Sequence, residues 1–330
     1  MTNPAHSRRV AGVLHRFVRQ SSLPCKRIRG ECDDFDECDA PGAPRGRTRG
    51  RRPVGRKGVR ADAVARPRNA TRRGVGAPPR GRTGAGARFG AEPAPSFGAL
   101  LERCEAVAFA VPPDVQADLA TIAARAGKHL LLDKPLALTL DAAQRLVDAI
   151  DTAGVVTQLM LTHRFRDQTN AFLARARAFG AFGARFAFLT GAFISGVYAT
   201  PWRRERGALY DLGPHALDLL EAALGPIEHL GCRGEPRRWV SVTCTHAGGA
   251  VSELAMSGSV PLAQTICRLE LYGAQGALEF DAVAASSESP WARVRKSFAD
   301  SVRAGRSGPL DAHRGLELQQ LIDRAQRSMV

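Results

Sequence analysis

The sequence predicts two folded units after its N-terminal segment: an α/β unit built on a parallel sheet, then an α+β unit built on a mainly antiparallel sheet. Between residues 87 and 161, short continuous apolar runs alternate with amphipathic helical patterns. Between residues 162 and 330, short runs alternate apolar with polar residues and are joined by turns that contain glycine. Residues 1–95 show neither pattern, because glycine and proline interrupt any regular spacing of apolar residues.

The charge of the chain is unevenly distributed. Its 330 residues include 47 Lys or Arg against 32 Asp or Glu, a formal net charge of +15. Residues 1–95 hold 22 basic and 8 acidic residues, so the rest of the chain is nearly neutral. No run of about 18 apolar residues is present to span a bilayer, which argues against an integral membrane protein. The seven cysteines have no paired spacing and no signal peptide is evident, so we expect reduced thiols and a cytoplasmic location.

Residues 1–86 form a basic segment rich in Arg, Gly and Pro, for which three interpretations are open. Its arginine run fits an arm that neutralises nucleic-acid phosphates, although few aromatic residues are present to stack on bases. The composition also fits a disordered tail, or a GC-rich gene translated in the wrong frame, and of the three we expect a disordered or frame-shifted segment. Neither its acidic stretch nor its cysteines have the spacing of a metal site, so we predict none. The run consists of Arg45, Arg47, Arg49, Arg51 and Arg52.

The α/β unit, residues 87–161, follows the order strand, helix, strand, helix, strand. The predicted elements are the end of a helix at Phe97–Glu102, strands at Ala106–Val111, His129–Leu132 and Val155–Leu161, and helices from Val115 to Gly127 and from Thr139 or Asp141 to Ile150. This order is half of a doubly wound sheet, so we predict an incomplete Rossmann-like domain. Ligands of such sheets bind beyond the carboxyl ends of the strands, where Pro112–Pro113 and Asp133–Pro135 fall.

The second unit, residues 162–330, predicts an open, mainly antiparallel sheet with helices on one face. Its turns are His246–Gly249 and Gly273–Gly276. The predicted strands are Ala184–Thr190, Trp239–Cys244, Val251–Met256, Arg268–Tyr272 and Ala277–Phe280, and the predicted helices are Asn170–Ala178, Pro214–Leu224 and Arg314–Ser328.

Two short motifs carry groups suited to chemistry. The first is Asp133-Lys134-Pro135 at the end of a strand, and the second is the segment Gly207–Asp218, where Asp211 and His215 lie four residues apart. A carboxylate at that distance could orient the imidazole, and the start of a helix disfavours the protonated imidazole, as a general base requires. The alternative is that Asp211 caps the helix and His215 packs beneath the sheet.

The chain from about Ala87 onward resembles the Gfo/Idh/MocA family of nicotinamide-dependent oxidoreductases. The segment Ala106–Leu138, AVAFAVPPDVQADLATIAARAGKHLLLDKPLAL, is similar to the family's last Rossmann strands with their Glu-Lys-Pro signature. Gly207–Leu220, GALYDLGPHALDLL, is similar to its Asp-x-Gly-x-His segment. Leu269–Phe280 and Leu316–Ser328 resemble its sheet hairpin and its final helix. Asp133 departs from the usual Glu, and Gln116 stands where many members have His.

The resemblance implies hydride transfer between NAD or NADP and a hydroxyl-bearing carbon of a sugar, cyclitol or related polyol. Lys134 matches the family lysine that contacts substrate and nicotinamide, His215 the acid/base histidine, and Asp211 the carboxylate beside it. His163 and Arg164 are candidates for holding the substrate, with a surface salt bridge as the alternative for Arg164. The implied cofactor-binding residues are Pro112, Pro113, Gln116, Asp133, Lys134 and Pro135.

These assignments require Lys134 from one unit and Asp211 and His215 from the other to converge on a shared cleft. We also expect homo-oligomer contacts through the C-terminal sheet.

The front of the chain departs from the family, which opens with a strand and a GxGxxG turn that holds the dinucleotide pyrophosphate. Gly74-x-Gly76 is followed by Pro79 where the third glycine belongs, and Gly84-x-Gly86 by Phe89. We therefore expect little or no NAD(P) binding by the chain as written, and an inactive chain is one outcome. Two other functions stay open: nucleic-acid binding through the basic segment, and non-catalytic sugar sensing by a family member.

Overall fold

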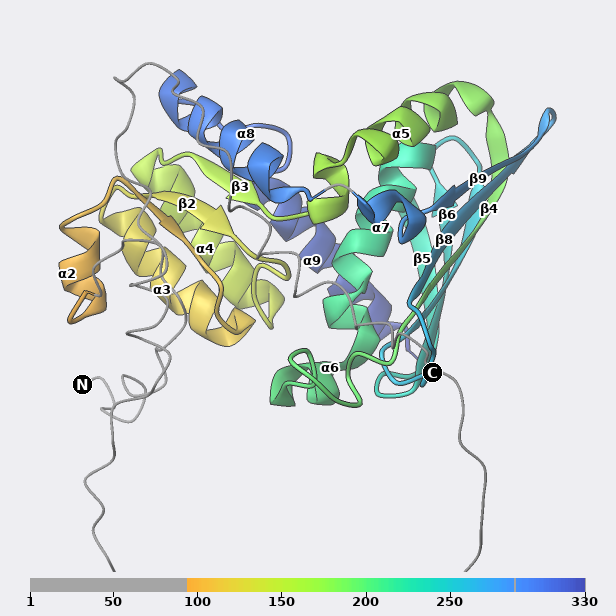
Figure 1. Ribbon diagram of the computed structural model, residues 1–330, viewed down its shortest axis with the longest axis horizontal. Helices are drawn as coiled ribbons and strands as arrows, with labels where there is room; N and C mark the ends of the chain where they lie inside the picture. The colour runs from red at the N-terminus through yellow and green to blue at the C-terminus, as the bar shows by residue number, and fades with distance from the viewer. Residues whose placement is uncertain (1–93, 288, 330) are drawn as a thin grey trace, which may run out of the picture.

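The structure of the chain, a computed structural model, describes residues 94–287 and 289–329. Figure 1 shows two units side by side: a small sheet between helices on the left and a larger sheet with helices against one face on the right. The predictions for residues 1–93, including the basic segment and the missing glycine turn, lie outside the described residues. Within the described part of the chain, every helix is too short or too polar to cross a bilayer.

The first unit contains the predicted parallel sheet, with strand order β1-β2-β3. Its last helix begins after Thr139, whose side chain accepts a hydrogen bond from the backbone N–H of Ala142, and ends at Gly154 in the left-handed conformation. Leu130 and Leu132 point into the core, where Leu146 packs with them. The elements are α2 (Phe97–Leu101), β1 (Ala106–Ala108), α3 (Pro113–Arg125), β2 (His129–Leu132), α4 (Leu140–Ala153) and β3 (Thr157–Leu159).

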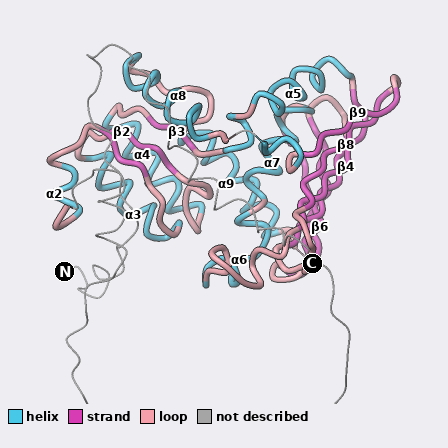
Figure 2. Tube along the Cα trace, in the orientation of Figure 1, coloured by secondary structure: helices cyan, strands magenta, loops and turns pink. Residues whose placement is uncertain are grey.

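The second unit contains a six-stranded sheet of order β5-β6-β7-β4-β8-β9. All neighbouring pairs are antiparallel except β4 and β7, so the predicted mainly antiparallel sheet is confirmed. Figure 2 shows its strands gathered into one layer, with helices α5 and α7 on one side. The elements are α5 (Asp167–Phe179), β4 (Ala181–Leu189), α7 (Gly213–Leu224), β5 (Ile227–Glu235), β6 (Trp239–His246), β7 (Val251–Ser257), β8 (Ile266–Gly273) and β9 (Gly276–Asp281).

Several elements of the second unit were not predicted. They are η2 (Thr162–Phe165), α6 (Pro201–Asp211), β5, η3 (Ala284–Ser287) and α8 (Trp291–Ala304). Strand β5 is an edge strand in which only Ile227 and Cys232 are buried, so it lacks the alternation that identifies a strand. Helix α6 is interrupted at Gly207, which has φ 72° and ψ −164°.

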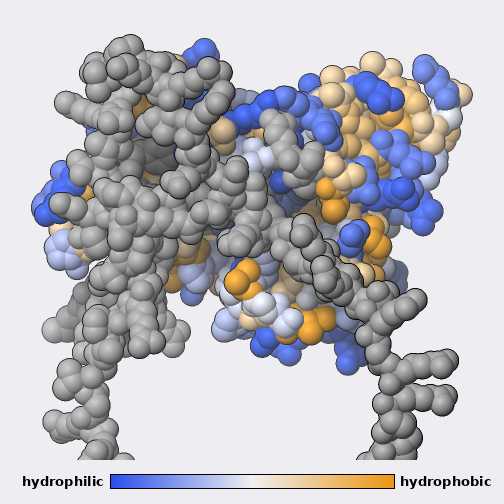
Figure 3. Space-filling model, viewed as in Figure 1, coloured by the Kyte–Doolittle hydropathy of each residue, from blue (hydrophilic) through white to orange (hydrophobic). Residues whose placement is uncertain are grey.

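Figure 3 shows apolar residues on the outer side of α5, where Ala171, Ala174 and Ala178 are exposed.

The C-terminal residues connect the two units. Helix α9 (Ala312–Arg327) packs against α4 and β3 of the first unit and against α7 and β5 of the second. The chain just before it lies beside β3: the N–H of Leu159 donates to the carbonyl of Leu310 at 2.7 Å, and the N–H of Ala312 donates to Thr157 Oγ1 at 3.0 Å. The end of the chain, predicted as part of the second unit, therefore also completes the packing of the first.

Candidate active site

An ion pair between Lys134 and Asp211 joins the two units. Lys134 lies in the loop after β2, and its Nζ donates at 2.8 Å both to Asp211 Oδ1 and to the Asp211 carbonyl oxygen. The Nε of Arg203 lies 3.1 Å from the same Oδ1. The side chains are 12% exposed for Lys134, 8% for Asp211 and 16% for Arg203. Burial opposes ionisation of Asp211, but the two cations outweigh it and hold the pKa of Asp211 below its usual value.

The kink at Gly207 carries Asp211 into this position. At Gly207 the backbone adopts φ 72°, and a Cβ there would lie only 1.9 Å from the carbonyl oxygen of Pro236. The N–H of Ala208 donates to that same carbonyl at 3.2 Å, so a side chain at position 207 would break this junction. Asp211 then ends α6, and α7 begins two residues later with Pro214 in its first turn.

His215 and His163 form a second feature of the site. His215 lies in the first turn of α7 and His163 in η2, with ring centroids 5.2 Å apart in an edge-to-face arrangement. The Nδ1 atoms of both rings are buried without a hydrogen-bond partner. Burial, with the positive charges of Arg166 and Lys134 adding to it, lowers the pKa of His163 to about 3 and that of His215 well below 6.5. Both imidazoles are therefore neutral at pH 7.

The prediction that the Asp211 carboxylate orients the His215 imidazole is wrong. Lys134 and Asp211 converge as predicted, but among the described residues the carboxylate pairs with Lys134 and Arg203, not with the imidazole. Two cations attract a buried carboxylate more strongly than a neutral ring does. The alternative that Asp211 caps α7 is also wrong, because the helix begins after Leu212 and has no side-chain cap.

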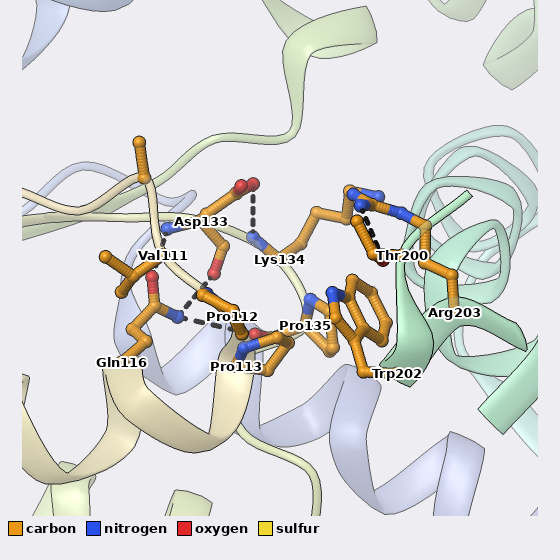
Figure 4. Close-up of a pocket in the computed structure, with 11 residues that line it drawn as sticks. Val111, Pro112, Pro113, Gln116, Asp133, Lys134, Pro135, Thr200, Trp202 and Arg203 are labelled. Atoms are coloured by element: carbon orange, nitrogen blue, oxygen red, sulfur yellow. Dashed lines mark hydrogen bonds between the residues drawn. The ribbon is translucent and has the colours of Figure 1, made fainter. Parts of the chain in front are cut away.

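A cavity of about 260 Å³ lies at the carboxyl ends of β1 and β2, next to Lys134. Figure 4 shows Trp202 and Arg203 approaching it from the second unit, opposite Asp133 and Lys134. Burial, only partly offset by Lys134, raises the pKa of Asp133. Its lining consists of Ala110, Val111, Pro112, Pro113, Gln116, Asp133, Lys134, Pro135, Thr200, Trp202 and Arg203.

All six predicted cofactor-binding residues therefore line one cavity. His215 and His163 are not among the lining residues. Trp202 and Arg203 were missed, although they are an aromatic and a cation at the start of a segment that ends at Asp211. The guanidinium of Arg203 lies 4.5 Å from the ring centroid of Trp202 and 5.3 Å from that of Tyr198, which stiffens this wall.

Arg164 is held in an ion-pair network that differs from the surface salt bridge expected as its alternative role. Its Nη1 donates to both carboxylate oxygens of Asp218 at 3.0 Å. Arg314 on α9 donates to the same carboxylate at 3.0 Å and to Glu221 at 2.7 Å. Asp218 is 1% exposed, so this network is largely buried and not a surface salt bridge. It ties η2, α7 and α9 together. Within the described ranges, His, Cys, Asp and Glu form no cluster suited to a metal ion.

Comparison with known proteins adds sequence evidence to this geometry. Residues 57–161 match the family described as "Oxidoreductase family, NAD-binding Rossmann fold", and residues 181–279 match the "GFO/IDH/MocA C-terminal domain". The first match begins inside the segment predicted to lie outside the folded units, in residues that the structure does not describe. Both matches are to oxidoreductases, so nucleic-acid binding gains no support.

Curated relatives share part of the chain. It is 30% identical over 199 residues to the D-apiose dehydrogenase of Paraburkholderia graminis, which covers 55% of this chain and 52% of that one. It is 28% identical over 154 residues to the levoglucosan dehydrogenase of Pseudarthrobacter phenanthrenivorans, covering 44% and 38%. The alignments thus span between a third and about half of the length of these curated relatives.

Solved structures share the fold. GenD2 from gentamicin A biosynthesis, in complex with NAD, has a TM-score of 0.66 at 21% identity, covering 74% of this chain and 82% of that one. Levoglucosan dehydrogenase in complex with NADH and levoglucosan has a TM-score of 0.66 at 17% identity, covering 75% and 84%.

Proposed function

Because the chain belongs to the GFO/IDH/MocA family of oxidoreductases, we propose that it transfers hydride between NAD or NADP and a hydroxyl-bearing carbon of a sugar, cyclitol or related polyol. The observation that carries the proposal is the 2.8 Å pair between Lys134 and Asp211, which brings a cation from one unit and a carboxylate from the other to the edge of the cavity. The sugar as substrate class is supported by relatives named as dehydrogenases of D-apiose and levoglucosan.

The cavity fits the nicotinamide end of such a cofactor. It lies beyond the carboxyl ends of β1 and β2, and its volume of about 260 Å³ suits a ring and part of a ribose better than a whole dinucleotide. Pro112, Pro113 and Pro135 offer apolar walls, and Trp202 offers a flat aromatic one. When bound, the cofactor supplies a carbon that accepts or returns hydride.

Lys134 is suited to stabilise negative charge on the substrate oxygen. An ammonium group has three N–H donors, and Asp211 takes two of them through its carboxylate and its carbonyl oxygen. The third donor is left for a hydroxyl group, in a direction fixed by the other two. A cation held in this way stabilises the alkoxide that develops when hydride leaves the carbon.

His215 is suited to accept or return the hydroxyl proton. Its Nδ1 is buried and its side chain as a whole is half-buried, so Nε2 would be the nitrogen that meets a substrate. The low pKa keeps the ring neutral at pH 7 and therefore able to take a proton. His163, edge to face with His215, is the candidate for holding a further hydroxyl group.

We also propose a homo-oligomer that forms through the second sheet. The face of this sheet turned away from α5 and α7 exposes large apolar side chains, and within the described residues no helix covers it. The exposed fractions are 42% for Trp239, 44% for Val251 and 40% for Ile266. A cytoplasmic location is supported by the buried thiols of Cys232, Cys244 and Cys267, which form no disulfide within the described residues.

The test of the proposed activity is turnover. The full chain and a chimera, in which the strand–glycine turn–helix–strand segment of a family member replaces residues 1–86, are assayed with NAD⁺ and NADP⁺ against a panel of sugars and cyclitols. We expect turnover by the chimera and its loss in Lys134→Ala and His215→Ala versions. Undiminished activity of either variant refutes its role. A chimera that binds NAD(P) and a sugar without turnover indicates a sensor, and one that binds neither refutes the proposal.

A further inference from the structure

Gln116 is the most fully hydrogen-bonded side chain in the neighbourhood of the cavity. It projects from α3 and is 1% exposed. Its Oε1 accepts from the backbone N–H of Asp133 at 2.9 Å. Its Nε2 donates to the carbonyl oxygens of Asp133 at 2.8 Å, Leu136 at 3.2 Å and Pro135 at 3.4 Å. Figure 4 shows this amide reaching from the helix to the loop that follows β2.

These four backbone groups belong to the loop that carries Lys134. Within the described part of the chain, Gln116 is the hydrogen-bond partner recorded for each of them. Without it, the loop would hold one buried N–H and three carbonyl oxygens with no partner, and each such group disfavours the conformation that buries it. The Gln116 amide therefore stabilises this conformation of the loop.

The chemistry required at position 116 is specific. The loop presents one donor and three acceptors, so its partner must accept once and donate more than once. A glutamine amide does both from a single planar group. An ionised carboxylate would accept but not donate, and a methionine of similar length would do neither.

We propose that Gln116 is a positioning residue for Lys134. It touches neither the ammonium group nor the Asp211 carboxylate, so it acts through the loop backbone on either side of Lys134. Only the importance of this role for catalysis rests on the proposed function. Whatever the activity, the amide keeps the Lys134 ammonium against Asp211 and away from solvent.

The experiment measures how fast Lys134 is acetylated by an amine-reactive ester in the full chain. The sequence has only five lysines, and Lys296, with a side chain 79% exposed, serves as an internal reference in the same mass spectrum. In the wild type we expect slow acetylation of Lys134, which is 12% exposed. In Gln116→Met we expect its rate relative to Lys296 to rise at least about tenfold. Gln116→Glu keeps the size and the acceptor, and we expect a rise in the same direction.

Gln158→Met is the matched control. Gln158 lies on β3, is 4% exposed and donates to the carbonyl of Val294 at 2.9 Å, so this variant also loses a buried amide and its hydrogen bond. We expect its Lys134 rate to stay within about twofold of the wild type. A folded Gln116 variant with wild-type labelling overturns the proposal, as does an equal rise in Gln158→Met. Loss of the fold in both Gln116 variants also overturns it, because Gln116 would then support the core and not the loop.

The labelling outcome is independent of turnover. If labelling of Lys134 rises while neither the full chain nor the chimera turns over, the proposed activity fails and the positioning role stands. If labelling is unchanged while the chimera turns over, the positioning role fails and the activity stands.

Discussion

Asp211→Asn is the substitution that most directly tests how the two units are held together. The change keeps the size of the side chain and the carbonyl contact to Lys134, but it removes the charge that two cations share. Lys134 and Arg203 are 12% and 16% exposed, so both would be left largely buried without a counter-charge.

The expected loss of unfolding free energy follows from leaving two buried cations without their shared carboxylate. Removing one partner of a buried ion pair costs about 3–5 kcal/mol, because the remaining charge stays buried. We expect Asp211→Asn to lie near the lower end, about 3 kcal/mol, because Lys134 still donates to a backbone carbonyl and Arg203 still stacks on Trp202. Lys134→Met leaves Asp211 paired with Arg203, so we expect a smaller loss, about 1 kcal/mol.

Urea unfolding of the full chain at pH 7 measures both changes in the free energy of unfolding. Asp141→Asn is the control, because it removes a carboxylate that pairs with Arg145 on the exposed face of α4, and no measurable change is expected. A loss below about 1 kcal/mol for Asp211→Asn would refute the reasoning. So would an equal loss for Lys134→Met, because the second cation would then have no effect.

Three further predictions concern pH and backbone geometry. Burial lowers the pKa of His163 to about 3, so between pH 6.5 and 3 this histidine binds a proton in the unfolded chain but not in the folded chain, and acid destabilises the fold. In His163→Phe this destabilisation, about 1.4 kcal/mol per pH unit, should be absent when urea unfolding is measured at pH 4 and 7. Burial lowers the pKa of His313, but Asp151 and Asp311 together raise it more, so the stabilisation from this histidine is complete below about pH 6.5 and is lost as pH rises through the raised pKa. The Tm of His313→Asn should fall below wild type at pH 6 and match it at pH 9. Gly207→Ala should cost more than about 2 kcal/mol of unfolding free energy, because its Cβ would meet a carbonyl 1.9 Å away, whereas Gly305→Ala, with a similar φ and open space around it, should cost only about 1 kcal/mol.

The parallel strands could be predicted because their sequence signal is local. Strand β2 matches its prediction residue for residue, since an apolar run ends there at Asp133. Strand β5 could not be predicted, because only Ile227 and Cys232 are buried in it and its neighbours supply the hydrogen bonds that define it. Helix α8 was missed although its sequence carries a helical signal, because Trp291, Val294, Phe298 and Val302 recur at helical spacing and pack into one apolar cluster.

Several residues of the site could be predicted from the sequence, but their contacts could be predicted only in part. Family resemblance was enough to single out Lys134, Asp211 and His215, and the structure brings Lys134 and Asp211 within 2.8 Å. The choice of partner for Asp211 was not predictable, because a spacing of four residues places His215 nearby in sequence while Arg203 reaches the carboxylate from an unpredicted helix. Which charges meet in a cleft is a property of the packed units, not of local spacing.

The partner that Asp211 takes also explains how the site keeps two kinds of group in different charge states. A free carboxylate beside His215 would raise the pKa of the imidazole and favour its protonated form. Lys134 and Arg203 neutralise that carboxylate, so it does not offset the effects of burial and of nearby positive charge on His215. The pKa of His215 therefore falls well below 6.5. The same pair thus takes up the charge of Asp211 and leaves the imidazole as a neutral base. A cation beside a neutral base is the arrangement that would serve the loss of hydride from a carbon and of a proton from its hydroxyl oxygen.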